Sequence, residues 1–166
     1  MRPRQFDRTL ALWRYEFPCN ELVLSLKYHA RLALAGFFAR KLASRSLPRV
    51  DLIVPMPLHP GRLAKRGFNQ ALEIARELSG YAGARIESRG ARRIKDTAQQ
   101  TDLPYDMRAK NVRGAFACSL NLSGRTVAVV DDVMTTGATL DEFARTLKLA
   151  GAVRVENWVV ARTMLD

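Results

Sequence analysis

The chain has 166 residues, of which 48% are hydrophobic, and its formal net charge is +11. This length fits one globular domain of roughly 100 to 200 residues that can bury a core without disulfides or a structural metal. No apolar run reaches the roughly 18 residues of a membrane span and residues 1–10 lack the apolar segment of a signal peptide, so we expect a soluble protein without membrane insertion.

The first half of the chain predicts a strand, a helical segment and a buried strand. Residues 10–17 have the aromatic and branched composition of a short strand, which Pro18 stops. Apolar residues then recur at helical spacings, which predicts one long helix over residues 20–44 or two helices broken near Ala30. Residues 50–60 begin with a continuous apolar run, typical of a strand buried on both faces of a parallel sheet, and their prolines predict a rigid loop at its exit.

The second half alternates between helix and strand. The expected elements are a helix over 69–80, a strand over 84–88, an exposed loop over 89–104, a short helix over 105–112, strands over 114–119 and 126–131, a helix over 139–151 and a last strand over 153–162. This order predicts an α/β fold with a mostly parallel sheet, whose ligand sites lie beyond the carboxyl ends of the strands.

The excess positive charge lies in one part of the chain. Residues 1–100 hold 19 Lys and Arg against 8 Asp and Glu, whereas residues 101–166 hold 8 of each. This asymmetry predicts a polyanionic partner, either the phosphates of a small ligand or single-stranded nucleic acid, with a solvated basic surface as the alternative. Trp13, Tyr15 and Tyr28 are candidates for base stacking, and core packing is their alternative role.

The two cysteines bear on location. Cys19 and Cys118 are far apart and form no Cys-x-x-Cys pair, so the sequence supports neither a zinc ribbon nor a dithiol redox motif. We therefore expect a cytoplasmic protein, with Cys118 in the core.

The strongest predicted strand ends in two adjacent carboxylates. Val127–Val130 lead into Asp131 and Asp132, and small hydroxylated residues follow around Gly137. Backbone N–H groups and threonine hydroxyls in such a turn can converge on a phosphate at a helix N-terminus. The carboxylates can accept hydrogen bonds from sugar hydroxyls or lie near Mg²⁺. The pattern indicates a sugar-phosphate site, because helix capping by Asp132 or Thr139 would leave the paired acids unexplained.

The stretch VAVVDDVMTTGAT, residues 127–139, resembles the signature of type I phosphoribosyltransferases, which bind 5-phosphoribosyl 1-diphosphate (PRPP). The stretches DLIVPMPLHPGRLAKRGFNQ and ARRIKDTAQQTDLPYD resemble the ComF/GntX-like branch of these proteins, whose competence members are associated with DNA uptake. The likeness spans about residues 12–162. The four-cysteine zinc module with which that family often begins is absent here, so a naturally short member and a chain that lost its first segment both remain open.

The resemblance implies one phosphoribosyltransferase-like domain, with a small N-terminal hood over residues 1–48 and a core over residues 49–166. It implies that Asp131 and Asp132 contact the ribose hydroxyls of PRPP, with Mg²⁺ as the cofactor. It further implies a 5-phosphate loop, a pyrophosphate loop and a mobile loop that closes over the site, although a plain surface role is the alternative for each basic residue. The candidates are Met134, Thr135, Thr136, Gly137, Ala138 and Thr139 for the 5-phosphate, Arg62, Lys65 and Arg66 for the pyrophosphate, and Arg92, Arg93 and Lys95 in the mobile loop.

The function that the resemblance implies is transfer of a phosphoribosyl group from PRPP to an acceptor that the sequence does not identify. Two alternatives stay open. One is a protein that binds or senses PRPP without catalysis, and the other is an accessory protein that handles single-stranded DNA together with the competence machinery. Thr135 occupies a position where purine-salvage relatives carry an acidic residue, and a threonine cannot act as a base near neutral pH, which argues against ordinary purine salvage.

Overall fold

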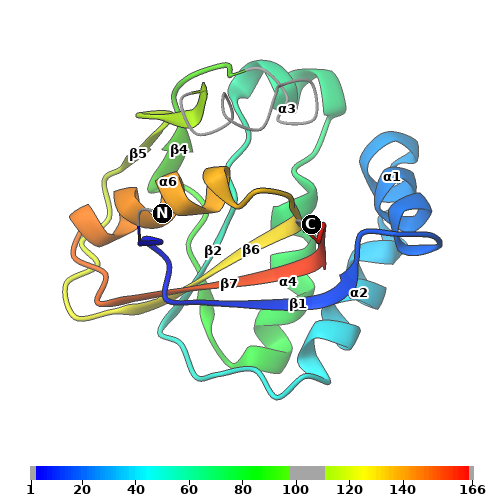
Figure 1. Cartoon of the computed structure of the whole chain (residues 1–166), viewed down its shortest axis with the longest axis horizontal. Coiled ribbons are helices and arrows are strands. Elements are labelled where there is room, and N and C mark those ends of the chain that lie inside the picture. The colour runs from blue at the N-terminus through cyan, green and yellow to red at the C-terminus, as the bar shows by residue number, and fades with distance from the viewer. Residues whose placement is uncertain (1–2, 98–110, 165–166) are drawn as a thin grey trace.

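A computed structural model describes residues 3–97 and 111–164, and its centre is a five-stranded sheet with helices on both faces (Figure 1). The strand order is β1-β7-β6-β2-β3, and every pairing within this sheet is parallel. The strands are β1 (Arg8–Arg14), β2 (Leu52–Pro55), β3 (Arg85–Ile86), β6 (Thr126–Met134) and β7 (Arg154–Arg162). The α/β class with a mostly parallel sheet, predicted from the sequence, is confirmed.

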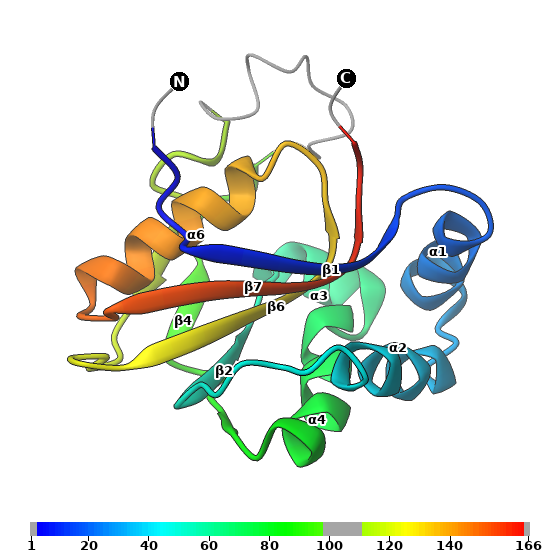
Figure 2. The same ribbon diagram turned by 60° about the horizontal axis from the view of Figure 1, so that its bottom comes forward.

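Helices form a layer on each side of the sheet. α2 (Ala33–Ala43) and α4 (Gln70–Ala82) lie on one face and α6 (Ala138–Leu149) on the other (Figure 2). Each face has its own apolar core, because successive strand residues point to opposite sides. Along β7, for example, Trp158 packs in the core beneath α2 and α4, whereas Val159 packs in the core beneath α6.

The N-terminal part of the chain is divided between the sheet and a helix at its edge. α1 (Cys19–His29) ends at Ala30, whose φ of 49° is left-handed, so the expected helical segment is two helices with a break at Ala30. β1 is the edge strand of the main sheet, and α2 packs against α4. Of the expected hood over residues 1–48, α1 is therefore the element that stands outside the sheet and its covering helices, and its role as a hood stays a proposal.

The rigid loop expected after β2 contains a helix, so this prediction is wrong in part. α3 (Pro60–Arg66) begins at a proline, which is favourable at the first helical position because its fixed φ suits the helix and its missing N–H is not needed there. The side chain of His59 caps the helix by accepting a hydrogen bond from the Gly61 N–H at 3.3 Å. Gly67 ends it at a φ of 84°. His59 is thus a capping residue of α3.

The loop expected over residues 89–104 is also interrupted. β4 (Ala91–Arg93) pairs antiparallel with β5 (Phe116–Cys118) in a separate two-stranded sheet. Three residues are too few to show the alternation of apolar and polar side chains that identifies a strand in a sequence. The partner of β4 also lies far along the chain. Cys118 is half-buried against the core beneath α6. Residues 98–110, which include most of the short helix expected over 105–112, lie outside the described residues.

The helices of residues 3–97 and 111–164 include none that is long and apolar enough to cross a membrane.

Candidate functional site

A cavity of about 760 Å³ lies at the carboxyl ends of β2 and β6. These two strands are neighbours, but the chain leaves β2 towards β3 through α3 and α4, and leaves β6 towards β7 through α6 on the opposite face. Diverging connections of this kind leave a crevice between two parallel strands, which is where open α/β sheets bind ligands. The site therefore lies where the fold class predicts it.

The paired acids of β6 point to opposite sides of the strand. β6 continues to Met134, beyond the end predicted at Asp131, because β7 pairs with it up to that residue. Side chains alternate along a strand, so Asp131 lines the cavity whereas Asp132 faces α1. There the Lys27 Nζ lies 2.8 Å from the Asp132 Oδ2. The sequence predicted both acids at the site, and the structure gives the second an ion-pair partner from the N-terminal region.

Asp131 and Lys27 have raised pKa values, with different consequences for their charge. Burial and then the neighbouring charge of Asp132 raise the pKa of Asp131 to about 8. Burial lowers the pKa of Lys27, but the carboxylates of Asp132 and Asp131 outweigh it and raise that pKa overall. Asp131 therefore exchanges a proton close to neutral pH while Lys27 stays charged.

The turn between β6 and α6 forms one end of the cavity. Of the six 5-phosphate candidates, those that line the cavity are Met134, Thr135, Gly137 and Thr139. Thr136 is buried, and its Oγ1 accepts a hydrogen bond from the Ala138 N–H at 3.3 Å. Gly137 is the N-cap of α6 and has no side chain of its own with which to cap the helix. The first N–H groups of a helix have no partner within it and carry partial positive charge, so this end of the cavity suits an anion.

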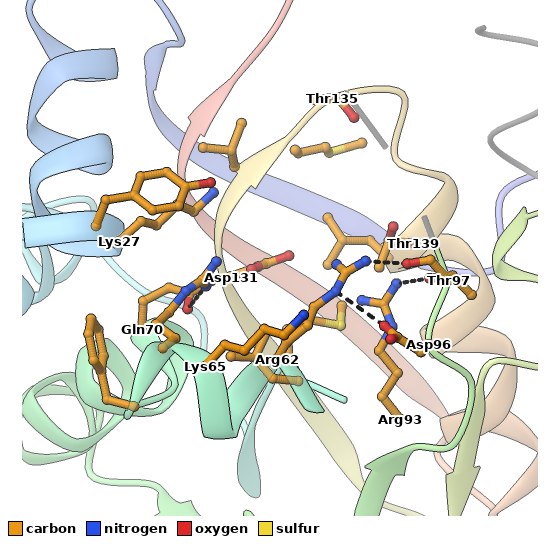
Figure 3. Close-up of a pocket in the computed structure, with 18 of the residues that line it drawn as sticks. Lys27, Arg62, Lys65, Gln70, Arg93, Asp96, Thr97, Asp131, Thr135 and Thr139 are labelled. Atoms are coloured by element: carbon orange, nitrogen blue, oxygen red, sulfur yellow. Dashed lines mark hydrogen bonds and ion pairs between the residues drawn. The ribbon is translucent and has the colours of Figure 1, made fainter. Parts of the chain in front are cut away.

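The opposite wall of the cavity is cationic. Arg62, Lys65 and Arg66 project from α3, and Arg93 projects from β4, so all three pyrophosphate candidates border the cavity (Figure 3). The Arg66 Nη1 donates a hydrogen bond to the Gln70 Oε1 at 2.5 Å. The structure thus brings basic residues from two separate segments to one surface.

Arg93 is the most confined of these cations. Its side chain is 7% exposed, and its guanidinium donates to the Thr97 hydroxyl. Burial and then the charge of Arg62 lower the pKa of Arg93. Arg62 itself donates to the Thr97 carbonyl, and its Nε lies 3.5 Å from the Asp96 Oδ1. Because two guanidinium groups lie close together here, an anionic ligand would relieve their repulsion.

The three mobile-loop candidates, Arg92, Arg93 and Lys95, lie at different places in the structure. Arg92 lies on the exposed face of β4 and borders a second cavity of about 680 Å³. The Lys95 Nζ donates to the Arg113 carbonyl at 2.9 Å, away from the first cavity. Of these three residues, Arg93 alone borders the first cavity. The remainder of the predicted mobile loop falls within residues 98–110, outside the described part.

Sequence reasoning missed several residues of the cavity wall. Lys27 follows the buried Leu26 on α1. A lysine directly beside apolar helix positions was the one feature of the sequence that could have marked it. Gln70 begins α4 and offered no signal in the sequence. Of the aromatic candidates, Trp13 and Tyr15 pack against the core, and Tyr15 and Tyr28 line the cavity.

The residues present fit a magnesium ion that is shared with a phosphate ligand. The described residues include no group of three His, Cys, Asp or Glu side chains that could hold a metal ion. Asp131 nevertheless places a carboxylate on the cavity wall, opposite the cations of α3. Mg²⁺ commonly binds through one or two carboxylates together with phosphate oxygens and water, and one carboxylate is compatible with that mode.

Comparison with known proteins gives a consistent result. Residues 63–164 match the family described as phosphoribosyl transferase domain. The chain is 34% identical to the DNA utilization protein YhgH of Salmonella typhi, over 98% of this chain and 75% of that protein. It is 30% identical to competence protein F of Haemophilus influenzae, over 95% of this chain and 73% of that protein.

A solved structure shares the fold. The allosteric regulatory enzyme of purine biosynthesis matches with a TM-score of 0.54 and 19% identity, over 82% of this chain and 30% of that one. At this identity the likeness concerns the fold alone.

Proposed function

Because the chain belongs to the phosphoribosyl transferase domain family, and within it to the ComF-like proteins, we propose that its cavity binds PRPP and that the protein transfers the phosphoribosyl group to an acceptor. The observation that carries the proposal is the division of the cavity wall. The N-terminus of α6 and Asp131 form one side, and the cations of α3 and β4 form the other. PRPP has the same division, with a phosphate and hydroxyls at one end and a diphosphate at the other.

In the proposed complex the 5-phosphate binds the turn from Met134 to Thr139. Asp131 accepts hydrogen bonds from the ribose hydroxyls, since its carboxylate lines the cavity on the same side as this turn. Asp132 supports this contact through its ion pair with Lys27. The diphosphate lies against the cationic wall, where charge-assisted hydrogen bonds are stronger than neutral ones.

In the proposed reaction a bond forms between the acceptor atom and the anomeric carbon of the ribose while the bond from that carbon to the diphosphate oxygen breaks. The electron pair of the broken bond leaves with the diphosphate, and the proton of the acceptor passes to the departing diphosphate or to water. Arg62, Lys65 and Arg93 stabilise the charge that develops on the leaving group, because cations fixed in advance act strongly where water is excluded.

Asp131 is the residue that would hold Mg²⁺ beside the ligand phosphates. When bound, the ion would neutralise part of the diphosphate charge.

Release of pyrophosphate from PRPP tests the transfer. We expect the protein with PRPP, Mg²⁺ and a panel of amines and nitrogen bases to release pyrophosphate with at least one acceptor. Asp131→Asn should abolish the release. The matched control is Asp51→Asn, at the other end of the sheet, where Asp51 accepts a hydrogen bond from the Thr126 N–H. PRPP binding without release under any condition would favour the alternative in which the protein binds or senses PRPP.

A second role in DNA handling is favoured by the charge distribution. Residues 1–100 hold 19 Lys and Arg against 8 Asp and Glu, and relatives carry the names DNA utilization protein and competence protein F. We propose that the chain contacts single-stranded DNA and acts with competence machinery proteins in the cytoplasm, where its free Cys19 and Cys118 would remain reduced. The logarithm of the affinity should then fall with the logarithm of salt concentration, by about 0.7 per phosphate contacted. DNA binding that does not respond to salt would argue against this role and favour the alternative of a solvated basic surface.

A further inference from the structure

The segment before β1 lies along α6. Asp7 anchors it near the end of the helix, because its Oδ2 accepts a hydrogen bond from the Val155 N–H at 2.8 Å and its Oδ1 lies 3.0 Å from the Lys148 Nζ. The Gln5 N–H donates to the Asp141 Oδ1 in the first turn of α6 at 2.6 Å. The Arg4 Nη2 donates to the Thr136 carbonyl, just before the helix, at 2.8 Å.

The order of these contacts shows that the segment runs antiparallel to α6. Asp7 contacts Lys148 in the last turn of the helix, and Gln5 contacts Asp141 in its first turn. The side chain of Arg4 then reaches the Thr136 carbonyl, in the turn that precedes α6.

Arg4 holds a peptide group whose orientation matters for the cavity. The C=O and N–H of a trans peptide point in opposite directions, so a Thr136 carbonyl that faces Arg4 directs the Gly137 N–H away from Arg4. Gly137 lines the cavity. Its φ is 79°, and glycine allows other backbone orientations at similar energy, so a hydrogen bond to the Thr136 carbonyl helps to fix the orientation of this peptide.

We infer that Arg4 is a positioning residue for the 5-phosphate turn, which it holds with the Gly137 N–H presented to the ligand. This inference rests on the proposed function in naming the 5-phosphate as that ligand. Arg4 does not border the cavity and acts through the Thr136–Gly137 peptide. The side chain is otherwise exposed, so its replacement should leave the fold intact.

Binding of three probes separates this role from a general loss of charge or structure. We expect Arg4→Ala to weaken the binding of ribose 5-phosphate, and of PRPP with Mg²⁺, by about five- to tenfold, as loss of one charge-assisted hydrogen bond allows. Inorganic pyrophosphate should bind unchanged, because the cationic wall is untouched. Arg4→Lys should restore part of the loss, since lysine can also donate to the carbonyl. Arg8→Ala, an exposed arginine in the same N-terminal region, should match the parent protein.

The inference is overturned if Arg4→Ala binds ribose 5-phosphate as the parent does, or if it loses pyrophosphate binding to the same extent. The Gly137 amide signal in NMR of the ligand-free protein gives an independent test. We expect exchange broadening of this signal in Arg4→Ala and none in the parent or in Arg8→Ala, and identical signals would refute the positioning role. If the parent binds no phosphoribosyl ligand, the proposed function fails, while the amide signal still decides whether Arg4 holds the turn.

Discussion

The two walls of the cavity are held in place by different means. On one wall, Asp131 and Met134 lie within a strand that pairs with β7 along its length, and Thr136 in the turn beyond them is buried. On the other wall, Arg62 and Arg93 depend on contacts of their side chains with Asp96 and Thr97, and Lys65 is exposed on α3. Substitutions on the strand wall should therefore affect both stability and binding, whereas many on the cationic wall should affect binding alone.

The largest expected effect is on stability and compares two lysines. Lys27 contacts the strand wall through Asp132, and Lys65 belongs to the cationic wall. Lys27→Met leaves the buried carboxylate of Asp132 without its partner, which should lower the free energy of unfolding by about 3 kcal/mol. Lys65→Met should change it by less than about 0.5 kcal/mol while weakening PRPP binding. Urea unfolding measures the first effect, and the double variant Lys27→Met with Asp132→Asn should recover part of the loss. Equal stability of the two single variants would contradict the contrast between the walls.

Neighbouring arginines on β4 sharpen the contrast within the cationic wall. Arg93 borders the cavity and Arg92 lies on the exposed face of the same strand. We expect Arg93→Gln to weaken pyrophosphate binding about tenfold or more, because a hydrogen bond to a charged group contributes on the order of 1.5 to 3 kcal/mol. Arg92→Gln should bind pyrophosphate like the parent. If Arg92→Gln loses as much affinity as Arg93→Gln, then Arg92 also reaches the ligand and the contrast between the two arginines is wrong.

The strand wall should also give PRPP binding a pH dependence. Ribose hydroxyls donate to the ionised form of Asp131, whose pKa is raised to about 8 by burial and by Asp132, so binding below that pH requires loss of a proton. The affinity should rise severalfold between pH 7 and about 8 and level off above it. Asp131→Asn should abolish the rise. A rise that survives in this variant would assign it to a group on the ligand or elsewhere.

The same pKa shift predicts how stability changes with pH. The folded-state pKa of Asp131 lies above its ordinary value of 3.8, so ionisation disfavours the folded protein. Its contribution to the free energy of unfolding should fall as the pH rises from about 4 to about 8. Urea unfolding of Asp131→Asn should lack this part of the decrease. An unchanged pH profile would mean that Asp131 ionises equally well in both states.

The smallest expected effect is an absence of purine salvage. Thr135 lines the cavity but carries no group that can remove a proton near neutral pH. We expect no conversion of hypoxanthine, guanine or adenine to nucleotide with PRPP and Mg²⁺, under conditions in which PRPP binds. Nucleotide above a no-enzyme control that disappears in the Asp131→Asn variant would show this argument to be wrong.

The sequence was informative where structure depends on local pattern. The alternation of apolar runs predicted the parallel sheet, and the buried run at Val127–Val130 placed Asp131 at a carboxyl end. Prolines after β2 were interpreted as a rigid loop, although Pro60 at a first helical position is also a signal for α3. β4 was missed because its three residues are paired only by tertiary structure.

The part of the site that could not be predicted comes from remote segments. Lys27 reaches Asp132 across more than a hundred residues of sequence, and Arg4 reaches Thr136 across a similar separation. No spacing rule connects such positions, because they meet only when the N-terminal region folds around the sheet. The residues of the signature can thus be predicted from one stretch of sequence. The residues that orient them can be identified only from the structure.

Calorimetric titration of the whole chain with PRPP and Mg²⁺ tests the central claim most directly. We expect saturable binding at one site in the parent protein, at least tenfold weaker binding in Asp131→Asn because a charged acceptor is lost, and parental binding in Asp51→Asn. No saturable binding by the parent, or equal affinity of the parent and Asp131→Asn, would contradict the assignment of this cavity to PRPP.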